Sequence, residues 1–161
     1  MEIRVDPYIL ILPDNISLVR LREREGERVI DISLNQISLY QLLTIINEVD
    51  TDQPIIHKLM VNTLLILGTT IEKVVVDDLV DGALHSRIYV KNGERIHTID
   101  ANITDAIGLA VVQDCPLLVL DNVFKKGDDE IKRLRKEKQV EISDEEALRI
   151  LNNIDPSKLP S

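Results

Sequence analysis

The dipeptide Asn92-Gly93 lies between two stretches of alternating polar and apolar residues, and it constrains the fold more than any other feature. Asn-Gly in such a setting is the strongest short-range signal for a β-hairpin, because both residues tolerate the positive φ of a type I′ turn. The pattern predicts strands over residues 83–91 and 94–101, joined by a two-residue turn. The second half of the chain therefore contains at least one antiparallel strand pair.

This turn also predicts which side chains share a face of the hairpin. It places His85 opposite Asp100 and Arg87 opposite Thr98, so an imidazole, a guanidinium and a carboxylate lie together. Such a cluster can orient a general base, hold a divalent cation or bind a phosphate. A polar outer face is equally typical of a solvated hairpin, and that alternative stays open. The other face is apolar and is expected to face the core; its members are Leu84, Ile88, Val90 and Ile99.

The remaining elements follow from hydrophobic periodicity and helix-capping residues. Asn35 is expected to cap the first helix and Asn102 the third. The order β-β-β-α-α-β-β-β-α-β predicts an α+β domain in which a mixed or antiparallel sheet packs against three main helices. The other expected elements are strands over 3–12, 17–22, 28–34, 72–79 and 116–120, and helices over 39–49, 55–67 and 103–113.

The composition changes after Phe124. Residues 125–138 hold seven basic and four acidic residues, a net charge of +3 that leaves −12 on the rest of the chain. We therefore expect an α+β domain over 1–124 and a charged, partly helical extension over 125–161. Within the extension, Ser143 begins a capping-box pattern for a short last helix, and residues 156–161 are expected to form a loose tail.

Charge and composition limit the partners of the chain. A net charge of −9, no Trp and one Phe argue against a non-specific nucleic-acid coat protein, which needs basic groups and stacking aromatics. No apolar run approaches the ~18 residues of a membrane span, and the charged opening residues argue against a secretory signal. We expect a soluble cytoplasmic protein without a membrane partner. A homodimer is also expected, through an open edge strand at residues 3–12 or 116–120.

Four further residues carry chemistry that needs an interpretation. Asp105 lies at the third position of its helix, where capping explains a carboxylate and catalysis is the alternative. His57 lies among apolar residues and is expected to be packed rather than a ligand, and His97 is expected to face the core. Cys115 cannot form an internal disulfide and is expected to be a small buried residue. The sequence has no phosphate-binding glycine loop or zinc-protease motif.

Residues 99–110 read Ile-Asp-Ala-Asn-Ile-Thr-Asp-Ala-Ile-Gly-Leu-Ala and resemble the signature I-D-A-R-P-S-D-A-I-A-L-A of the bifunctional nuclease (BFN) family. Residues 53–60, Gln-Pro-Ile-Ile-His-Lys-Leu-Met, resemble the R-P-L-T-H-D-L-L of that family, and the order of elements matches over 17–123. Four charged positions depart from the family pattern: Asn102 and Gln53 each replace Arg, Lys58 replaces Asp and Ser38 replaces Glu. Because apolar positions persist while polar ones change, the resemblance supports the fold more than the activity.

The resemblance implies a nuclease that acts on RNA and DNA. In the first hypothesis, metal-aided phosphodiester hydrolysis, Asp100 and Asp105 bind Mg²⁺ or Mn²⁺, His85 is a base or ligand, and Arg87 faces the phosphate. In the second hypothesis, the chain is a non-catalytic interaction module that kept the fold and lost the site. The missing Arg and Glu and the acidic main body support this second hypothesis. A small-molecule enzyme that uses the same cluster is a third alternative.

Overall fold

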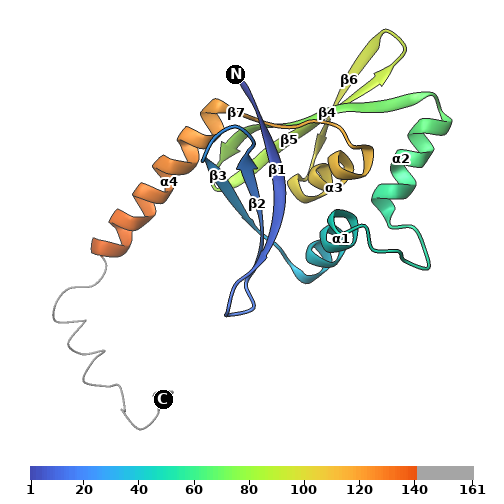
Figure 1. Ribbon diagram of the computed structural model, residues 1–161. Helices are drawn as coiled ribbons and strands as arrows, with labels where there is room; N and C mark the ends of the chain where they lie inside the picture. Colours follow the sequence, from blue (N-terminus) through green and yellow to red (C-terminus); the bar gives the residue numbers. More distant parts are fainter. Residues whose placement is uncertain (141–161) are drawn as a thin grey trace. The chain divides into compact units, whose positions relative to one another are not determined.

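The structure is a computed structural model that describes residues 1–140, with side chains as far as Arg133 (Figure 1). The predicted order of elements is confirmed, and a fourth helix follows the last strand. The strands are β1 (Glu2–Ile11), β2 (Ser17–Glu23), β3 (Val29–Ser33), β4 (Thr69–Val80), β5 (Ala83–Asn92), β6 (Arg95–Ala101) and β7 (Leu117–Leu120). The helices are α1 (Gln36–Ile46), α2 (Ile56–Ile66), α3 (Ile103–Gln113) and α4 (Asp121–Val140).

The described strands form one mixed sheet in the order β3-β2-β1-β7-β4-β5-β6. Neighbours are antiparallel except β4 and β7, which are parallel. The prediction that residues 3–12 or 116–120 form an open edge is wrong, because β1 and β7 lie inside the sheet and the edges are β3 and β6. A short, wholly apolar run such as β7 is typical of a strand covered on both sides.

The core lies between the sheet and helices α1, α2 and α3. Helix α3 packs against β4 and β5, α2 packs against α3 and β4, and α1 packs against α3. Burying an aliphatic side chain of this kind contributes about 1.5–3 kcal/mol. The many Ile, Leu and Val residues therefore have two effects. The β-branched ones favour strands, and all of them stabilise the core when buried. Among the fully buried side chains are Leu21, Leu42, Val74, Val76, Ile88 and Ile107.

The β5–β6 hairpin has a different register from the one predicted. Asn92 pairs with Arg95, so the two turn residues are Gly93 and Glu94. Gly93 has a φ of +58°, and Glu94 is not among the residues with positive φ. One positive φ, at the first turn position, is the pattern of a type II′ turn, which prefers Gly there. The Asn-Gly signal thus identified the hairpin but placed its turn one residue too early.

The corrected register changes the partners across the strands. Arg87 lies opposite Asp100, and His85 pairs instead with Asp78 of β4. Because the turn lies one residue later than predicted, each residue of β5 pairs two positions further along β6. A change of two positions keeps every side chain on its predicted face. The prediction that Ile99 and His97 face the core is wrong: Ile99 is 45% exposed and His97 is exposed. Because β6 is an edge strand, its side chains lack the neighbours that a second flanking strand would supply.

Both predicted asparagine caps are confirmed. Asn35 Oδ1 accepts a 2.8 Å hydrogen bond from Ser38 N, and Asn102 Oδ1 accepts one of 3.0 Å from Thr104 N. Helix α1 ends at Ile46, earlier than predicted, and α4 begins at Asp121, within the segment predicted to precede the extension. The predicted last helix at Ser143 and the tail over 156–161 lie outside the described residues.

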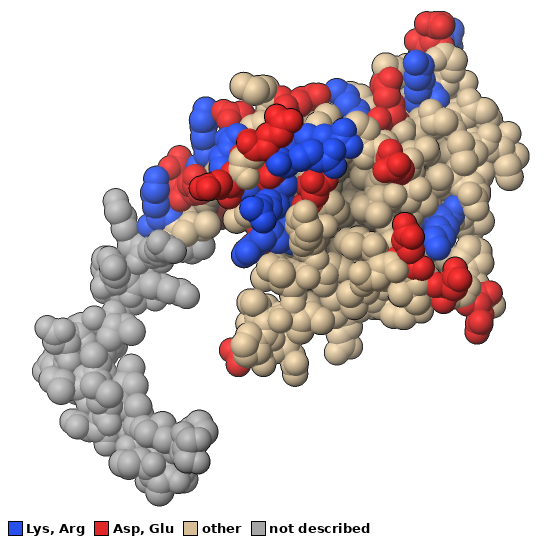
Figure 2. Space-filling model, in the orientation of Figure 1, with Lys and Arg blue, Asp and Glu red and all other residues tan. Residues whose placement is uncertain are grey.

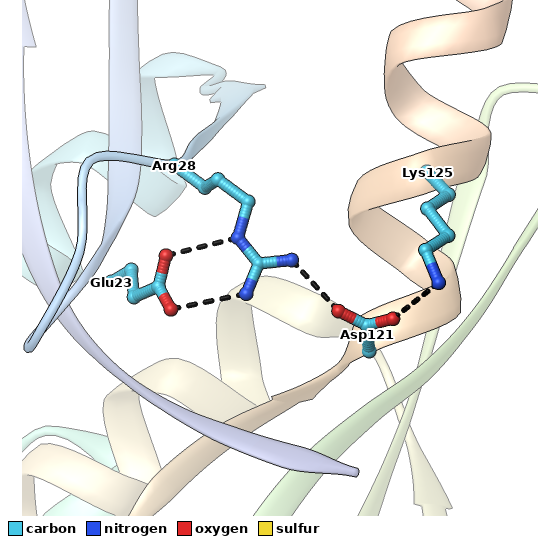
Figure 3. Close-up of polar contacts among 4 residues, drawn as sticks. All are labelled: Glu23, Arg28, Asp121 and Lys125. Atoms are coloured by element: carbon cyan, nitrogen blue, oxygen red, sulfur yellow. Dashed lines mark hydrogen bonds and ion pairs between the residues drawn. The ribbon is translucent and has the colours of Figure 1, made fainter.

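Arg28 connects the β2–β3 turn with the first turn of α4 (Figure 3). Its guanidinium donates to Glu23 at 2.9 and 3.0 Å and to Asp121 Oδ1 at 2.8 Å, and it lies 4.6 Å from the centroid of the Phe124 ring. Lys125 pairs with the other oxygen of Asp121 at 2.6 Å. Hydrogen bonds from Lys125 and Arg28 lower the pKa of Asp121 to about 2. This network holds the start of α4 against the strands.

The chain divides after Gly127 into two compact units, residues 1–127 and the residues that follow. Helix α4 thus begins in the first unit, which contains the whole sheet. None of the helices within residues 1–140 is long and apolar enough to cross a membrane.

Candidate functional site

A buried histidine and a half-exposed carboxylate meet where α2 and α3 begin. His57 Nε2 lies 3.2 Å from Asp105 Oδ1. The His57 side chain is 3% exposed, whereas that of Asp105 is 57% exposed. His57 is therefore packed, as predicted, but it also holds one oxygen of Asp105 and leaves the rest of that carboxylate open to solvent.

Gly108 allows the imidazole to lie against α3. A Cβ atom at position 108 would lie 2.7 Å from His57 Cδ2 and 2.9 Å from Nε2, closer than real Cβ atoms come. When Nε2 carries the hydrogen that faces Asp105, the other ring nitrogen of a neutral histidine is an acceptor. That nitrogen, Nδ1, is buried and has no hydrogen-bond partner in the described part of the chain. The ring is therefore fixed by packing and by one polar contact.

Asn102 leaves Asp105 free for this contact. Its side chain caps α3 by accepting from the backbone N and from Oγ1 of Thr104, at 3.0 and 2.7 Å. The carboxylate in the first turn still gains from the positive end of the helix dipole. The interpretation of Asp105 as a capping residue alone is therefore incomplete, because its partner is the ring of His57.

The other predicted site residues lie on the sheet. Arg87 Nε lies 3.2 Å from Asp100 Oδ1 and 3.1 Å from Asp77 Oδ2. Asp100 is 91% exposed and Asp77 only 18%. An exposed pair such as Arg87–Asp100 is worth little in stability, because water competes for both groups. The sequence interpretation missed Asp77, since the β4–β5 register contains bulges that no local pattern reveals.

His85 belongs to a different set of contacts. It lies opposite Asp78, whose carboxylate also pairs with Lys126 at 2.5 Å. The hydrogen bond from Lys126 is the main reason why the pKa of Asp78 is lowered, and His85 adds a small attraction. The predicted cluster is thus divided: His85 lies with Asp78, Arg87 with Asp100, and Asp105 with His57.

These residues do not form a ready cation site. Within residues 1–140, as far as side chains are described, no group of three or more His, Cys, Asp or Glu is placed to hold a metal ion. Asp100 pairs with Arg87, and Asp105 contacts His57. The two aspartates predicted as ligands therefore do not fit a metal centre made by the protein alone.

Cys115 does not supply a nucleophile. The thiol is partly buried, and burial raises its pKa to about 11. At neutral pH it is therefore protonated, and the thiol form is a poor nucleophile.

A comparison with models of protein families shows which family the chain belongs to. Residues 19–132 match the family model of the bifunctional nuclease domain. The chain belongs to the bifunctional nuclease domain family. No curated protein matches it.

The contact between His57 and Asp105 has a particular place in this bifunctional nuclease domain. The two residues come from separate segments, 53–60 and 99–110, which are the segments whose sequences resemble the family. Both segments lie within the matched region. Sequence reasoning considered each residue alone and missed the pair. The signal that could have linked them was the presence of both in the family patterns.

Proposed function

We propose that this bifunctional nuclease domain hydrolyses phosphodiester bonds of RNA or DNA at the exposed carboxylate of Asp105, which His57 holds in place. The contact between His57 Nε2 and Asp105 Oδ1 carries the proposal, because it joins the two segments that resemble the family. A buried imidazole behind an exposed carboxylate is an arrangement in which one group reacts and the other orients it.

In this proposal Asp105 is the general base. The oxygen that His57 does not contact accepts a proton from a water molecule, while the water oxygen attacks phosphorus and the bond to the leaving oxygen breaks. The leaving oxygen takes up a proton from solvent and departs as the alcohol. The amino-terminal end of α3 provides a positive potential for the phosphate. Arg87 pairs with Asp77 and Asp100 and has no role in this step. His57 acts through Asp105 and is a positioning residue.

Cleavage of single-stranded RNA and DNA by Asp105→Asn tests this assignment. Each protein is assayed with Mg²⁺, with Mn²⁺ and with EDTA, because the resemblance implies a cation that the described residues do not gather. We expect a loss of about 10²–10⁴-fold, the usual contribution of a general base. Equal cleavage by Asp105→Asn and the wild type would reject the assignment.

Asp114→Asn is the matched control. Asp114 is exposed at the opposite end of α3 and has a φ of +55°, a conformation that Asn tolerates well. It should therefore cleave like the wild type. An Asp100→Asn arm distinguishes the proposed site from the sequence-based cluster: loss of activity there, and not in Asp105→Asn, would favour that cluster.

A non-catalytic interaction module is the second candidate. It is favoured by the lack of a three-ligand group in the described residues and by Asn102 at a position where the family signature has Arg. Absence of cleavage under all three conditions, by protein that is folded, would support this second function.

A further inference from the structure

Four arginines lie on one face of the β1–β2 strand pair. Side chains alternate along a strand, and the β1–β2 register places this face opposite the one that carries buried Val19 and Leu21. Figure 2 shows Lys and Arg side chains gathered where β1–β3 and the start of α4 lie, interleaved with acidic ones. We call this surface the arginine face; its members are Arg4, Arg20, Arg22 and Arg24.

Two of the four arginines are neutralised by aspartates. Arg20 donates two hydrogen bonds of 2.7 Å to Asp31. Arg24 donates two to Asp6, at 3.0 and 2.5 Å. The hydrogen bond from Arg24 is the main cause of the lowered pKa of Asp6, and Arg4 adds a weaker attraction. Both aspartates are therefore already paired, and Glu2, on the same face of β1, pairs with Lys73.

Within the part of the chain whose side chains are described, the other two arginines have no such partner. Arg4 and Arg22 are exposed, and neither forms an ion pair or side-chain hydrogen bond with the residues whose side chains are described. The arginine face with Asp6 and Asp31 has a net charge of +2, on a chain whose total charge is −9. Two guanidiniums that are unpaired among the described residues, on an acidic protein, favour an anionic ligand.

The spacing of the arginine face fits a repeating anion. Arg4 of β1 and Arg22 of β2 are diagonal neighbours, because Asp6 lies opposite Arg22, and such neighbours are about 7–8 Å apart. This spacing is comparable to that of successive phosphates in an extended nucleic-acid strand. Tyr8 lies on the same face, opposite Arg20, and is 50% exposed. An exposed tyrosine beside arginines is a typical platform for an unpaired base.

The arginine face and Asp105 lie towards the same edge of the sheet. The strand directions from β6 through β5, β4 and β7 make β6 run opposite to β1. The last residues of β6 and the first residues of β1 therefore share an edge. Helix α3, which carries Asp105, begins directly after β6. β1 and β6 are four strand positions apart, a separation on the order of 20 Å. Val19 and Leu21 share the core with α3, so the arginine face lies on the other side of the sheet and a bound strand must pass around this edge to reach Asp105.

We propose that the arginine face binds the phosphate backbone of a single-stranded nucleic acid, with Arg4 and Arg22 contacting phosphates and Tyr8 stacking on a base. This inference rests on the proposed function, which makes a nucleic acid the substrate. The arginine face then holds the strand while its continuation reaches the start of α3.

Binding of fluorescently labelled oligodeoxythymidylate, measured by anisotropy with EDTA present, tests the inference. The variant Arg4→Gln/Arg22→Gln should bind at least about 10-fold more weakly, and its salt dependence should fall by about 1.4 in slope because two phosphate contacts are lost. Arg4→Lys/Arg22→Lys keeps both charges and should retain most of the affinity. Circular dichroism establishes that each variant is folded.

Lys91→Gln/Arg95→Gln is the matched control, because it removes the same charge from the exposed β5–β6 hairpin. It should bind like the wild type. Equal weakening by both Gln pairs would mean that only total charge matters and would overturn the proposal. So would a wild type that does not bind the oligonucleotide. Competition by polyglutamate as strong as that by the oligonucleotide would indicate an acidic protein partner and overturn it too.

The binding assay and the cleavage assay can contradict the binding inference and the proposed function separately. Asp105→Asn should bind the oligonucleotide like the wild type, since its carboxylate is not part of the arginine face. A wild type that binds through Arg4 and Arg22 but never cleaves would contradict the proposed function and leave the binding inference standing. If the wild type cleaves and Arg4→Gln/Arg22→Gln cleaves with the same efficiency, only the binding inference is contradicted.

Discussion

At the scale of the residue, the absence of one Cβ atom determines how the candidate site is built. Gly108 lies in α3 without a positive φ, so the reason for glycine there is space and not backbone conformation. The space is taken by the ring of His57, which reaches Asp105 from it. A small residue on one helix thus sets the position of a side chain on another.

Gly108→Ala should therefore destabilise the protein by about 1–3 kcal/mol, because the added methyl forces the His57 ring to move within a packed region. Urea denaturation measures the change. Gly127→Ala is the control: nothing lies within 4 Å of a Cβ there, and Ala is a better helix former than Gly by about 0.8–1.0 kcal/mol. A Gly108→Ala protein as stable as the wild type would show that the ring is not confined as described.

At the scale of the element, local sequence signals were sufficient for the helices and strands. Alternating residues, two asparagine caps and the Asn-Gly hairpin signal act within a few residues of the chain, so the order of elements could be predicted. The neighbours of β7 could not, because a strand pairs according to long-range packing that a single run of Leu and Val does not encode. The contact between His57 and Asp105 joins residues 48 apart and was out of reach for the same reason.

The junction between the β2–β3 turn and α4 should respond to pH through Asp121. Its pKa is about 2 in the folded protein against an ordinary 3.8, so the unfolded chain binds the proton more tightly. The stabilisation is complete above pH 3.8 and is lost as the pH falls toward 2. Asp121→Asn should therefore lower the urea midpoint at neutral pH. The difference in midpoint from the wild type should shrink as the pH falls from 3.8 toward 2. A difference that stays constant down to that pH would contradict this role.

At the scale of the whole molecule, the sheet formed by the described strands has β3 and β6 at its edges. Ile96 and Ile99 of β6 are 52% and 45% exposed, and an edge with apolar side chains is prone to pair with another chain. The homodimer expected from the sequence stays a prediction, but the strands that could pair are the edge strands β3 and β6 instead of β1 and β7. Gel filtration with light scattering should give twice the mass of the chain; a monomer at micromolar concentration would contradict it.

We propose above all that the carboxylate held by His57 is the reactive group of this bifunctional nuclease domain. The most direct test is the rate of oligonucleotide cleavage in each fraction across the gel-filtration peak, for the wild type and for Asp105→Asn purified in parallel. We expect a rate proportional to the protein concentration in every wild-type fraction and background rates throughout the Asp105→Asn peak. Activity that is displaced from the wild-type protein peak, or that is equal in the two proteins, would contradict it.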